Sequence, residues 1–359
     1  MDKIFGFLAP FFIYFFIFIL NALLPGRWVR GYVNKPGTSE KLMYRLNGLW
    51  VLAAVIITWG ILCYNGIIQW DWLWQIRWYS LAGAVTVGLA FSFAIVLPYP
   101  GVRKNFLIDF YLGRLENPQL WEGRVDVKML LYLSGAVMLE LNVLSFASHH
   151  QIVYDGNVSP GFIMAAAFLS FFVTEYLFFE EVHLYTYDFL AERVGFKLGW
   201  GDLAFYPFFY AIPLWATAEL PAPRTPAFIL VISAMIFLCG WWLARGANMQ
   251  KYTFKKNPGK VFLGIKPQTI TDGKKSILVS GFWGLSRHIN YLGEILMALG
   301  IVLCVGYPML PWPWLYALYY VLLLFPRQMA DDKLCAAKYG DLWDEYRKKV
   351  PYRIIPFIY

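Results

Sequence analysis

Charged residues are scarce in this chain. Asp, Glu, Lys and Arg make up 15% of its 359 residues, whereas soluble globular proteins average about 25%. The deficit excludes an ordinary soluble domain, and hydrophobic residues instead reach 59%. Apolar runs of about 20 residues, each long enough to cross a bilayer as a helix, recur along the chain. The composition therefore predicts an integral membrane protein.

Motifs for disulfides, metals and nucleotides are also missing. The cysteines show no paired spacing, which argues against a disulfide framework or a zinc site. The adjacent His149 and His150 point to opposite sides of any regular element, so no metal site is expected. There is no P-loop and no glycine-rich dinucleotide turn, so a bound dinucleotide would not be held by a Rossmann unit. Basic and aromatic residues do not interleave outside the membrane loops, and no nucleic acid partner is expected. The four cysteines are Cys63, Cys239, Cys304 and Cys335.

The apolar segments predict an all-α, polytopic protein with nine to ten transmembrane helices. The first segment is too long for the core of a signal peptide and lacks a small-residue cleavage site, so we interpret it as a span. A shorter apolar piece at 277–285 leaves open a tenth span or a re-entrant turn. The nine expected spans are residues 5–25, 46–68, 78–98, 129–147, 161–179, 203–219, 226–244, 289–306 and 312–325.

The basic residues predict the orientation of these spans. With the N-terminus outside, nearly all of the 31 lysines and arginines fall on one side, while Lys3, Arg77 and Arg224 fall on the other. By the positive-inside rule the basic side is cytoplasmic. The cytoplasmic connections are then residues 26–45, 99–128, 180–202 and 245–275, together with the tail 326–359.

The stretch "GFWGLSRHINYLGEIL" (281–296) places polar chemistry at the mouth of the eighth span. If the helix begins at 287, then Arg287, Asn290, Tyr291 and Glu294 share one face. A charged side chain within a span costs about 2.5–3.5 kcal/mol on insertion scales, so it normally turns toward a partner or a cavity. One alternative remains open: Arg287 and Glu294 pair with each other or with a neighbouring helix as structural contacts.

Two further span exits carry cations at the same depth. Lys251 and Lys255 follow the seventh span four residues apart, and Arg327 and Asp331 follow the last span with the same spacing. Several cations around one cavity suit a multiply phosphorylated cofactor. The lysines have an alternative role, in which they reach lipid phosphates at the membrane surface.

These residues lie in longer motifs that resemble the integral membrane sterol reductases, the family that reduces C14, C7 or C24 double bonds and includes a domain of the lamin B receptor. "LVSGFWGLSRHINYLGE" is similar to the family signature, and "YRLNGLW" (44–50) to its first loop. "DFYLGRLENPQLWEGRVDVKM" (109–129), "YDFLAERVGFKLGWGDLAFYPFFY" (187–210) and the tail "DDKLCAAKYGDLWDEYRKKVPYRIIPFIY" resemble later family motifs in the same order.

The resemblance implies one membrane-embedded reductase domain over residues 1–359. Residues 1–200 would form the N-terminal helices on the lipid and substrate side, and residues 201–359 the catalytic half that binds NADPH facing the cytoplasm. The substrate would be a sterol from the bilayer, with membrane lipid as surroundings. The membrane would be the endoplasmic reticulum in a eukaryote or the inner membrane in a bacterium. The implied NADPH contacts are Lys251, Lys255, Trp283, Arg287, His288, Asn290, Tyr291, Arg327 and Asp331.

The chain departs from the family pattern at three points. Phe282 stands where the signature usually has a tryptophan, Glu294 where it often has aspartate, and Phe172 where the C14 and C7 branches carry the tyrosine usually proposed as proton donor. The paired Glu180 and Glu181 in "FFEEVHLYTYDF" resemble the C24-reducing branch, which we therefore favour, with C7 and C14 left open.

An isolated alkene must be protonated before it accepts hydride, so such an enzyme needs an acid beside the substrate. We expect Glu180 or Glu181 to be this acid, with Glu175, Tyr176 and Asp331 as further candidates. As an alternative to a role as proton donor, Glu180 and Glu181 are solvated loop residues. The corresponding alternative for Glu175 is a structural hydrogen bond to Asn142 or Glu140.

Two other functions remain open at this point. A membrane methyltransferase of the isoprenylcysteine type shares an Arg-His-x-x-Tyr-x-Gly pattern and a similar tail. Its cofactor, S-adenosylmethionine, is cationic and would not need the cluster of Lys251, Lys255, Arg287 and Arg327. A sterol-binding protein without turnover is the second alternative, although the positions implied to contact the cofactor are largely intact.

Overall fold

The computed structural model describes residues 2–359, which fold into two compact units that meet in the sequence between Ala222 and Pro223. Helices dominate both units, as expected where the surrounding lipid offers backbone groups no hydrogen bonds. Five helices of the described residues are long and apolar enough to cross a membrane: those starting at Lys3, Arg77, Val127, Pro160 and Ala227. The prediction of a helical polytopic protein is confirmed, while the number of spans and the division at residue 200 stay predictions.

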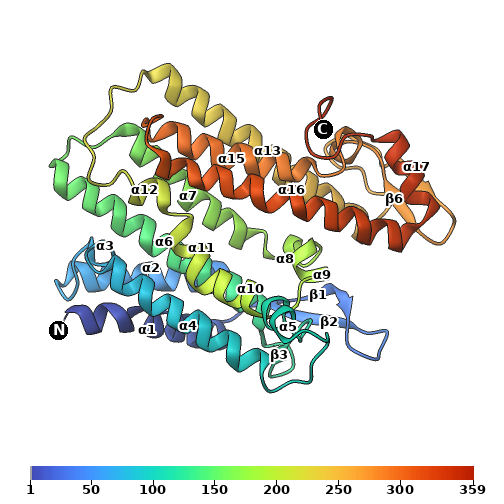
Figure 1. Cartoon of the computed structure of the whole chain (residues 1–359), viewed down its shortest axis with the longest axis horizontal. Helices are drawn as coiled ribbons and strands as arrows, with labels where there is room; N and C mark the ends of the chain where they lie inside the picture. Colours follow the sequence, from blue (N-terminus) through green and yellow to red (C-terminus); the bar gives the residue numbers. More distant parts are fainter. Residues whose placement is uncertain (1) are drawn as a thin grey trace. The chain divides into compact units, whose positions relative to one another are not determined.

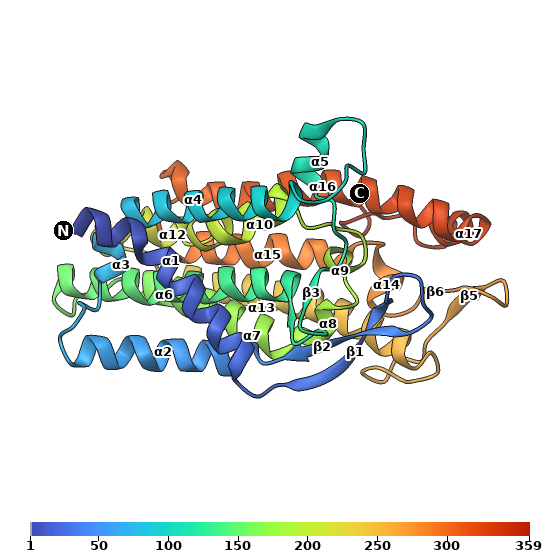
Figure 2. The same ribbon diagram turned by 90° about the horizontal axis from the view of Figure 1, so that it is seen from below.

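The first unit is built around one buried helix, α6 (Val127–Tyr154). The most apolar window of α6 is 83% buried, against 33% for α1 and α4 and 44% for α7. Its neighbours α1, α2 and α7 pack along it, and α4 packs along α1 (Figures 1 and 2). These surrounding helices are α1 (Asp2–Leu23), α2 (Gly48–Tyr64), α4 (Arg77–Val96) and α7 (Pro160–Phe178).

Short elements close the ends of this unit. Two antiparallel hairpins, β1–β2 and β3–β4, follow α1 and precede α6 respectively. The fully buried Lys128 donates from Nζ to the carbonyl oxygens of Asp188 and Glu192 at 3.1 and 2.6 Å, which fastens the loop around α9 to α6. The short elements are β1 (Arg27–Asn34), β2 (Lys41–Leu46), α3 (Trp72–Gln75), α5 (Phe106–Leu112), β3 (Gln119–Leu120), β4 (Val125–Asp126), α8 (Glu180–His183) and α9 (Tyr187–Leu190).

The expectation of one uninterrupted helix over 203–219 is wrong. The chain there forms helical pieces, including a π-helical turn, and a turn at Tyr210 and Ala211 interrupts them. Pro207 and Pro213 explain the break, because a proline has no N–H to donate to the carbonyl four residues earlier. The pieces are α10 (Phe196–Trp200), η1 (Gly201–Phe205), α11 (Tyr206–Phe209) and α12 (Ile212–Trp215).

The second unit has three long helices, α13 (Ala227–Lys256), α15 (Ile289–Cys304) and α16 (Pro311–Tyr339). Helices α13 and α16 continue beyond the expected spans, so their polar ends are helical too. A hairpin of β5 (Thr269–Thr271) and β6 (Ser276–Leu278) lies at one end with α14 (Phe282–Leu285) and α17 (Asp341–Lys349) (Figure 2). The apolar piece 277–285 is therefore a strand end and one short helix, not a tenth span.

Candidate functional site

The polar residues expected at three span exits all belong to the second unit. Lys251 and Lys255 lie in the last turns of α13, and the Nζ of Lys251 lies 5.2 Å from the ring centre of Trp283. Two hydrogen bonds hold Trp283 in place, one through its side chain and one through its backbone. Its Nε1 donates to the carbonyl of Ala247 at 2.9 Å, and its own carbonyl accepts from the hydroxyl of Tyr346 at 2.8 Å.

A glycine turn brings Trp283 back against α13. Gly281 has a φ of 63°, a backbone conformation that favours glycine. The buried Gln250 spans this turn, since its Oε1 accepts from the N–H of Phe282 at 3.0 Å and its Nε2 donates to the carbonyl of Ser280 at 3.2 Å. A Cβ at Gly281 would lie 2.3 Å from the Gln250 amide, so the turn requires glycine.

Arg287 and His288 lie before α15 rather than on it, because the helix begins at Ile289. The expectation that Arg287 shares a helical face with Asn290 and Glu294 is therefore wrong. The tail sets these backbones instead: the N–H of Arg287 donates to the carbonyl of Tyr352 at 3.0 Å, and that of His288 to the carbonyl of Arg353 at 2.8 Å.

Two aspartates of α16 lie beside the side chains of Arg287 and His288. The Arg287 Nη1 lies 3.5 Å from the Oδ2 of Asp332, and the His288 Nδ1 lies 3.7 Å from the Oδ2 of Asp331. Both side chains are almost fully buried, at 3% exposure for Arg287 and 4% for His288. The His288 ring also stacks on Tyr291 at 5.0 Å between ring centres. The first turn of α15 is thereby joined to the polar end of α16.

Burial and charge act together on these groups. Burial lowers the pKa of Arg287, while the carboxylate of Asp332 opposes that shift. Burial of the Asp332 carboxyl raises its pKa, but the contact with His288 and the charge of Arg287 outweigh this and leave the pKa below its ordinary value. Asp332 is therefore ionised at neutral pH and provides a fixed negative charge beside Arg287.

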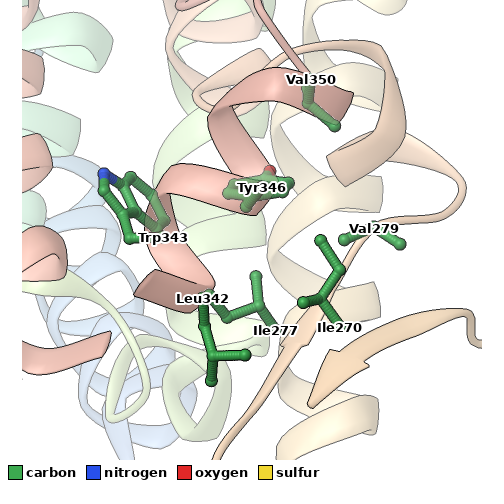
Figure 3. Close-up of a cluster of buried hydrophobic side chains, with 7 residues drawn as sticks. All are labelled: Ile270, Ile277, Val279, Leu342, Trp343, Tyr346 and Val350. Carbon is green, nitrogen blue, oxygen red and sulfur yellow. The ribbon is translucent and has the colours of Figure 1, made fainter. Parts of the chain in front are cut away.

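An apolar cluster holds α17 against the β5–β6 hairpin and so supports the site (Figure 3). Because Tyr346 belongs to this cluster and also donates to the Trp283 carbonyl, the cluster links α17 to α14. The cluster consists of Ile270, Ile277, Val279, Leu342, Trp343, Tyr346 and Val350.

The geometry adds residues that the sequence analysis did not assign to the site. Asp332, Gln250 and Tyr346 each contact a residue expected to bind the cofactor. Only Asp332 had a signal in the sequence, its position beside Asp331. Asn290 contributes a buried Oδ1 that has no hydrogen-bond partner among residues 2–359, and its Nδ2 makes a long contact of 3.4 Å with Asn248. Arg327 lies on α16, one turn before Asp331.

Four of the five expected acids belong to the first unit. Glu180 is buried, and its Oε2 accepts from the N–H of Gly48, the first residue of α2, at 3.1 Å. Burial raises the pKa of Glu180 to about 7, although the Gly48 N–H and the charge of Arg27 oppose the shift. Glu181 pairs with Arg27 at 2.8 Å.

The remaining candidates of this unit lie on α7. The Tyr176 ring stacks on His183 at 3.9 Å. The partners considered for Glu175 make other bonds: Asn142 donates to the carbonyl of Pro207 at 2.9 Å, and Glu140 accepts from Ser170 at 2.9 Å. The role of proton donor stays a prediction for every acid of this unit.

Comparison with known proteins gives concordant matches. The model of the "Ergosterol biosynthesis ERG4/ERG24 family" matches residues 3–359. The Delta(14)-sterol reductase of Arabidopsis thaliana is 33% identical, with 97% of this chain and 95% of that protein covered. The protein of the same name from Methylotuvimicrobium alcaliphilum is 32% identical, with 95% and 80% covered. The Delta(14)-sterol reductase TM7SF2 of Mus musculus is 36% identical, with 76% and 65% covered.

Proposed function

The chain belongs to the ergosterol biosynthesis ERG4/ERG24 family, and from this premise we propose that it reduces the C14 double bond of a sterol with NADPH. The three relatives described above all carry the Delta(14) name, which favours C14. The preference for the C24 bond, drawn from the paired Glu180 and Glu181, is not confirmed. The observation that carries the proposal is the convergence of α13, α14, the start of α15 and the polar end of α16 on one partly buried, mainly cationic cluster.

The residues of this cluster fit a nicotinamide dinucleotide phosphate. Lys251 and Lys255 provide point charges for phosphates, and Arg287 and Arg327 provide planar forks for phosphate oxygens. Trp283 offers an aromatic face, and the buried Oδ1 of Asn290 offers an acceptor for an amide or hydroxyl. We assign the full set of expected contacts to the cofactor: Lys251, Lys255, Trp283, Arg287, His288, Asn290, Tyr291, Arg327 and Asp331.

The bound cofactor supplies hydride, and the protein must supply a proton. Protonation of a C14 double bond at C15 leaves positive charge on C14, the more substituted carbon, which then accepts hydride. Asp331 is the expected acid that lies within the cationic cluster, 3.7 Å from His288. We therefore place Asp331 first as the group that holds or relays the proton, with Glu180, Glu181 and Glu175 of the first unit as further candidates.

The surroundings follow from the same proposal. A sterol substrate enters from the bilayer in which the apolar helices lie, and membrane lipid surrounds the protein. The basic connections favour a cytoplasmic position for the cofactor cluster. The membrane is that of the endoplasmic reticulum in a eukaryotic cell. Family membership over nearly the whole chain favours reduction over methyl transfer, and measured turnover separates an enzyme from a sterol-binding protein.

Cofactor affinity tests the proposal. We expect NADPH to bind the purified protein about tenfold or more tightly than NADH, because one charge-assisted contact to the extra phosphate contributes about 1.5–3 kcal/mol. Lys251→Ala should weaken NADPH binding by a similar factor, whereas Lys260→Ala, an exposed lysine beyond α13, should leave it unchanged. Equal affinity of the unmodified protein for NADPH and NADH would contradict the proposal.

A further inference from the structure

A second polar site lies in the same unit, beside α17. It is a cavity of about 530 Å³ lined by Arg287, Asp344, Arg347, Lys348, Pro351 and Arg353. Of these residues only Arg287 is assigned above to the cofactor. The cavity takes its other residues from α17 and from the chain that follows it.

The lining of this cavity is strongly cationic. Three guanidinium groups and one ammonium group face a carboxylate, that of Asp344. Asp344 pairs with Arg347 at 3.4 Å, but both side chains are at least half exposed, so solvent screens the pair and its contribution is small. The excess of positive charge is therefore not balanced by the residues that line the cavity.

Arg287 is buried and incompletely hydrogen-bonded. Its Nε and Nη1 have no hydrogen-bond partner within residues 2–359, although Nη1 lies 3.5 Å from the carboxylate of Asp332, and its Nη2 reaches the carbonyl of Pro351 only at 3.5 Å. An unpaired buried donor destabilises the fold, and more so where the group is charged. Burial has the largest effect on the pKa of Arg287 and lowers it; the carboxylate of Asp332 opposes this shift, and the charges of Arg347 and Arg353 lower the pKa further. Both observations indicate a site that is stabilised when an anion enters.

We infer that this cavity binds the phosphate group of an anionic ligand, taken either from a soluble phosphate or from a phospholipid headgroup. Arginine forks match phosphate oxygens through two parallel hydrogen bonds, and Lys348 adds a point charge. Such a ligand satisfies the free donors of Arg287 and neutralises Arg347 and Arg353. A lipid source fits the next residues of the chain, because Phe357 and Ile358 are 81% and 79% exposed.

The test uses the full chain, purified in phosphate-free buffer without cofactor or sterol, so that its outcome does not depend on reductase activity. Arg347→Gln combined with Arg353→Gln removes two charges from the lining. Lys274→Gln combined with Lys349→Gln removes the same charge from exposed positions of the same unit that do not line the cavity. If the lining pair fails to fold, Lys348→Gln alone replaces it. The unfolding midpoint without ligand monitors folding.

Two probes distinguish the sources. Inorganic phosphate is titrated against the thermal unfolding midpoint, and phosphatidic acid is compared with phosphatidylcholine as bound adducts in native mass spectrometry. We expect at least one probe to bind about tenfold or more weakly to the lining variant, since each lost charge-assisted contact contributes about 1.5–3 kcal/mol, and unchanged binding to the exposed control. Phosphate binding alone identifies a soluble ligand, and phosphatidic acid binding alone identifies a headgroup. Equal losses in both charge variants, or no binding of either probe, would overturn the inference.

Discussion

At the scale of single residues, backbone hydrogen bonds to a distant segment of the chain position the residues of the site. Arg287 and His288 receive their positions from the carbonyls of Tyr352 and Arg353, about 65 residues later in the chain. Ser286 joins the same contact, since its hydroxyl donates to the carbonyl of Ile354 at 2.9 Å. The backbone of segment 351–354 therefore positions Ser286, Arg287 and His288.

The buried carboxyl of Glu180 predicts that the stability of the protein depends on pH. Its pKa is raised to about 7 in the folded protein from an ordinary value of 4.5. The folded state therefore holds the proton more tightly than the unfolded state does, and stability falls as pH rises from about 4.5 through 7. We expect Glu180→Gln to remove this dependence and to stabilise the protein above pH 7, by up to about 3 kcal/mol. The amide oxygen of glutamine still accepts from the Gly48 N–H.

Thermal unfolding of the protein in detergent across this pH range measures the effect. Glu181→Gln is the matched control, because that side chain is ion-paired with Arg27 rather than buried against α2. Its stability should depend on pH as that of the unmodified protein does. If Glu180→Gln retains the full loss of stability between pH 4.5 and 7, the carboxyl is not the group that titrates.

The sequence identified most of the residues now found in the cluster, but not their geometry. The spacing of Lys251, Arg287, Asn290 and Asp331 at span exits was sufficient to group them. It could not show that α15 begins only at Ile289, because the carbonyls that hold Arg287 and His288 come from a distant tail. The pairing of Arg287 with Asp332 instead of Glu294 follows from the same displacement.

At the scale of elements, small residues let α13 and α15 approach closely. A Cβ on Gly293 would lie 2.4 Å from the backbone nitrogen of Ala244, and one on Gly240 would lie 2.6 Å from the carbonyl oxygen of Gly293. Close packing of this kind is a main source of helix association in membranes, where no hydrophobic effect acts between helices. The contact fixes α15 against the helix that carries Lys251 and Lys255.

Gly293→Val tests this contact. The added atoms meet backbone that cannot move aside, so we expect a loss of stability of about 1–3 kcal/mol or more. The position of α15 against α13 should also shift, which should weaken NADPH binding. Gly60→Ala is the control, since this glycine lies within α2 and a Cβ there has no atom within 4 Å. Unfolding midpoints in detergent report both variants, and equal midpoints would show that the α13–α15 interface tolerates extra volume.

Hydropathy located the long helices because the bilayer demands both apolar side chains and internal backbone hydrogen bonds. Hydropathy failed where a segment is apolar but is not one continuous helix, and where a helix continues although its residues are polar. The segment 203–219 is apolar enough to span, yet Pro207 and Pro213 interrupt its hydrogen bonding. Conversely, α13 continues as a helix after its apolar run ends, because leaving the membrane does not break a helix that lacks a stop signal, and α16 continues even through Pro326.

At the scale of the whole molecule, the family was predictable from motifs and the reduced bond was not. The motifs that carry the resemblance include residues that we propose to bind the cofactor, such as Trp283, Arg287 and Asn290. The choice between C14 and C24 depends on how a rigid sterol is placed beside the acid. Glu180 and Glu181 favoured C24 from sequence, but in the folded chain they contact α2 and Arg27.

Isotope placement on a single substrate tests the central claim most directly. The purified protein is given a sterol that carries both C14 and C24 double bonds, together with NADPH deuterated at its transferable hydrogen, and the product is read by mass spectrometry and NMR. The proposed function predicts one deuterium at C14, a solvent proton at C15 and an intact C24 double bond. Deuterium at C24 or C25, deuterium at C15, or no transfer from NADPH would contradict it.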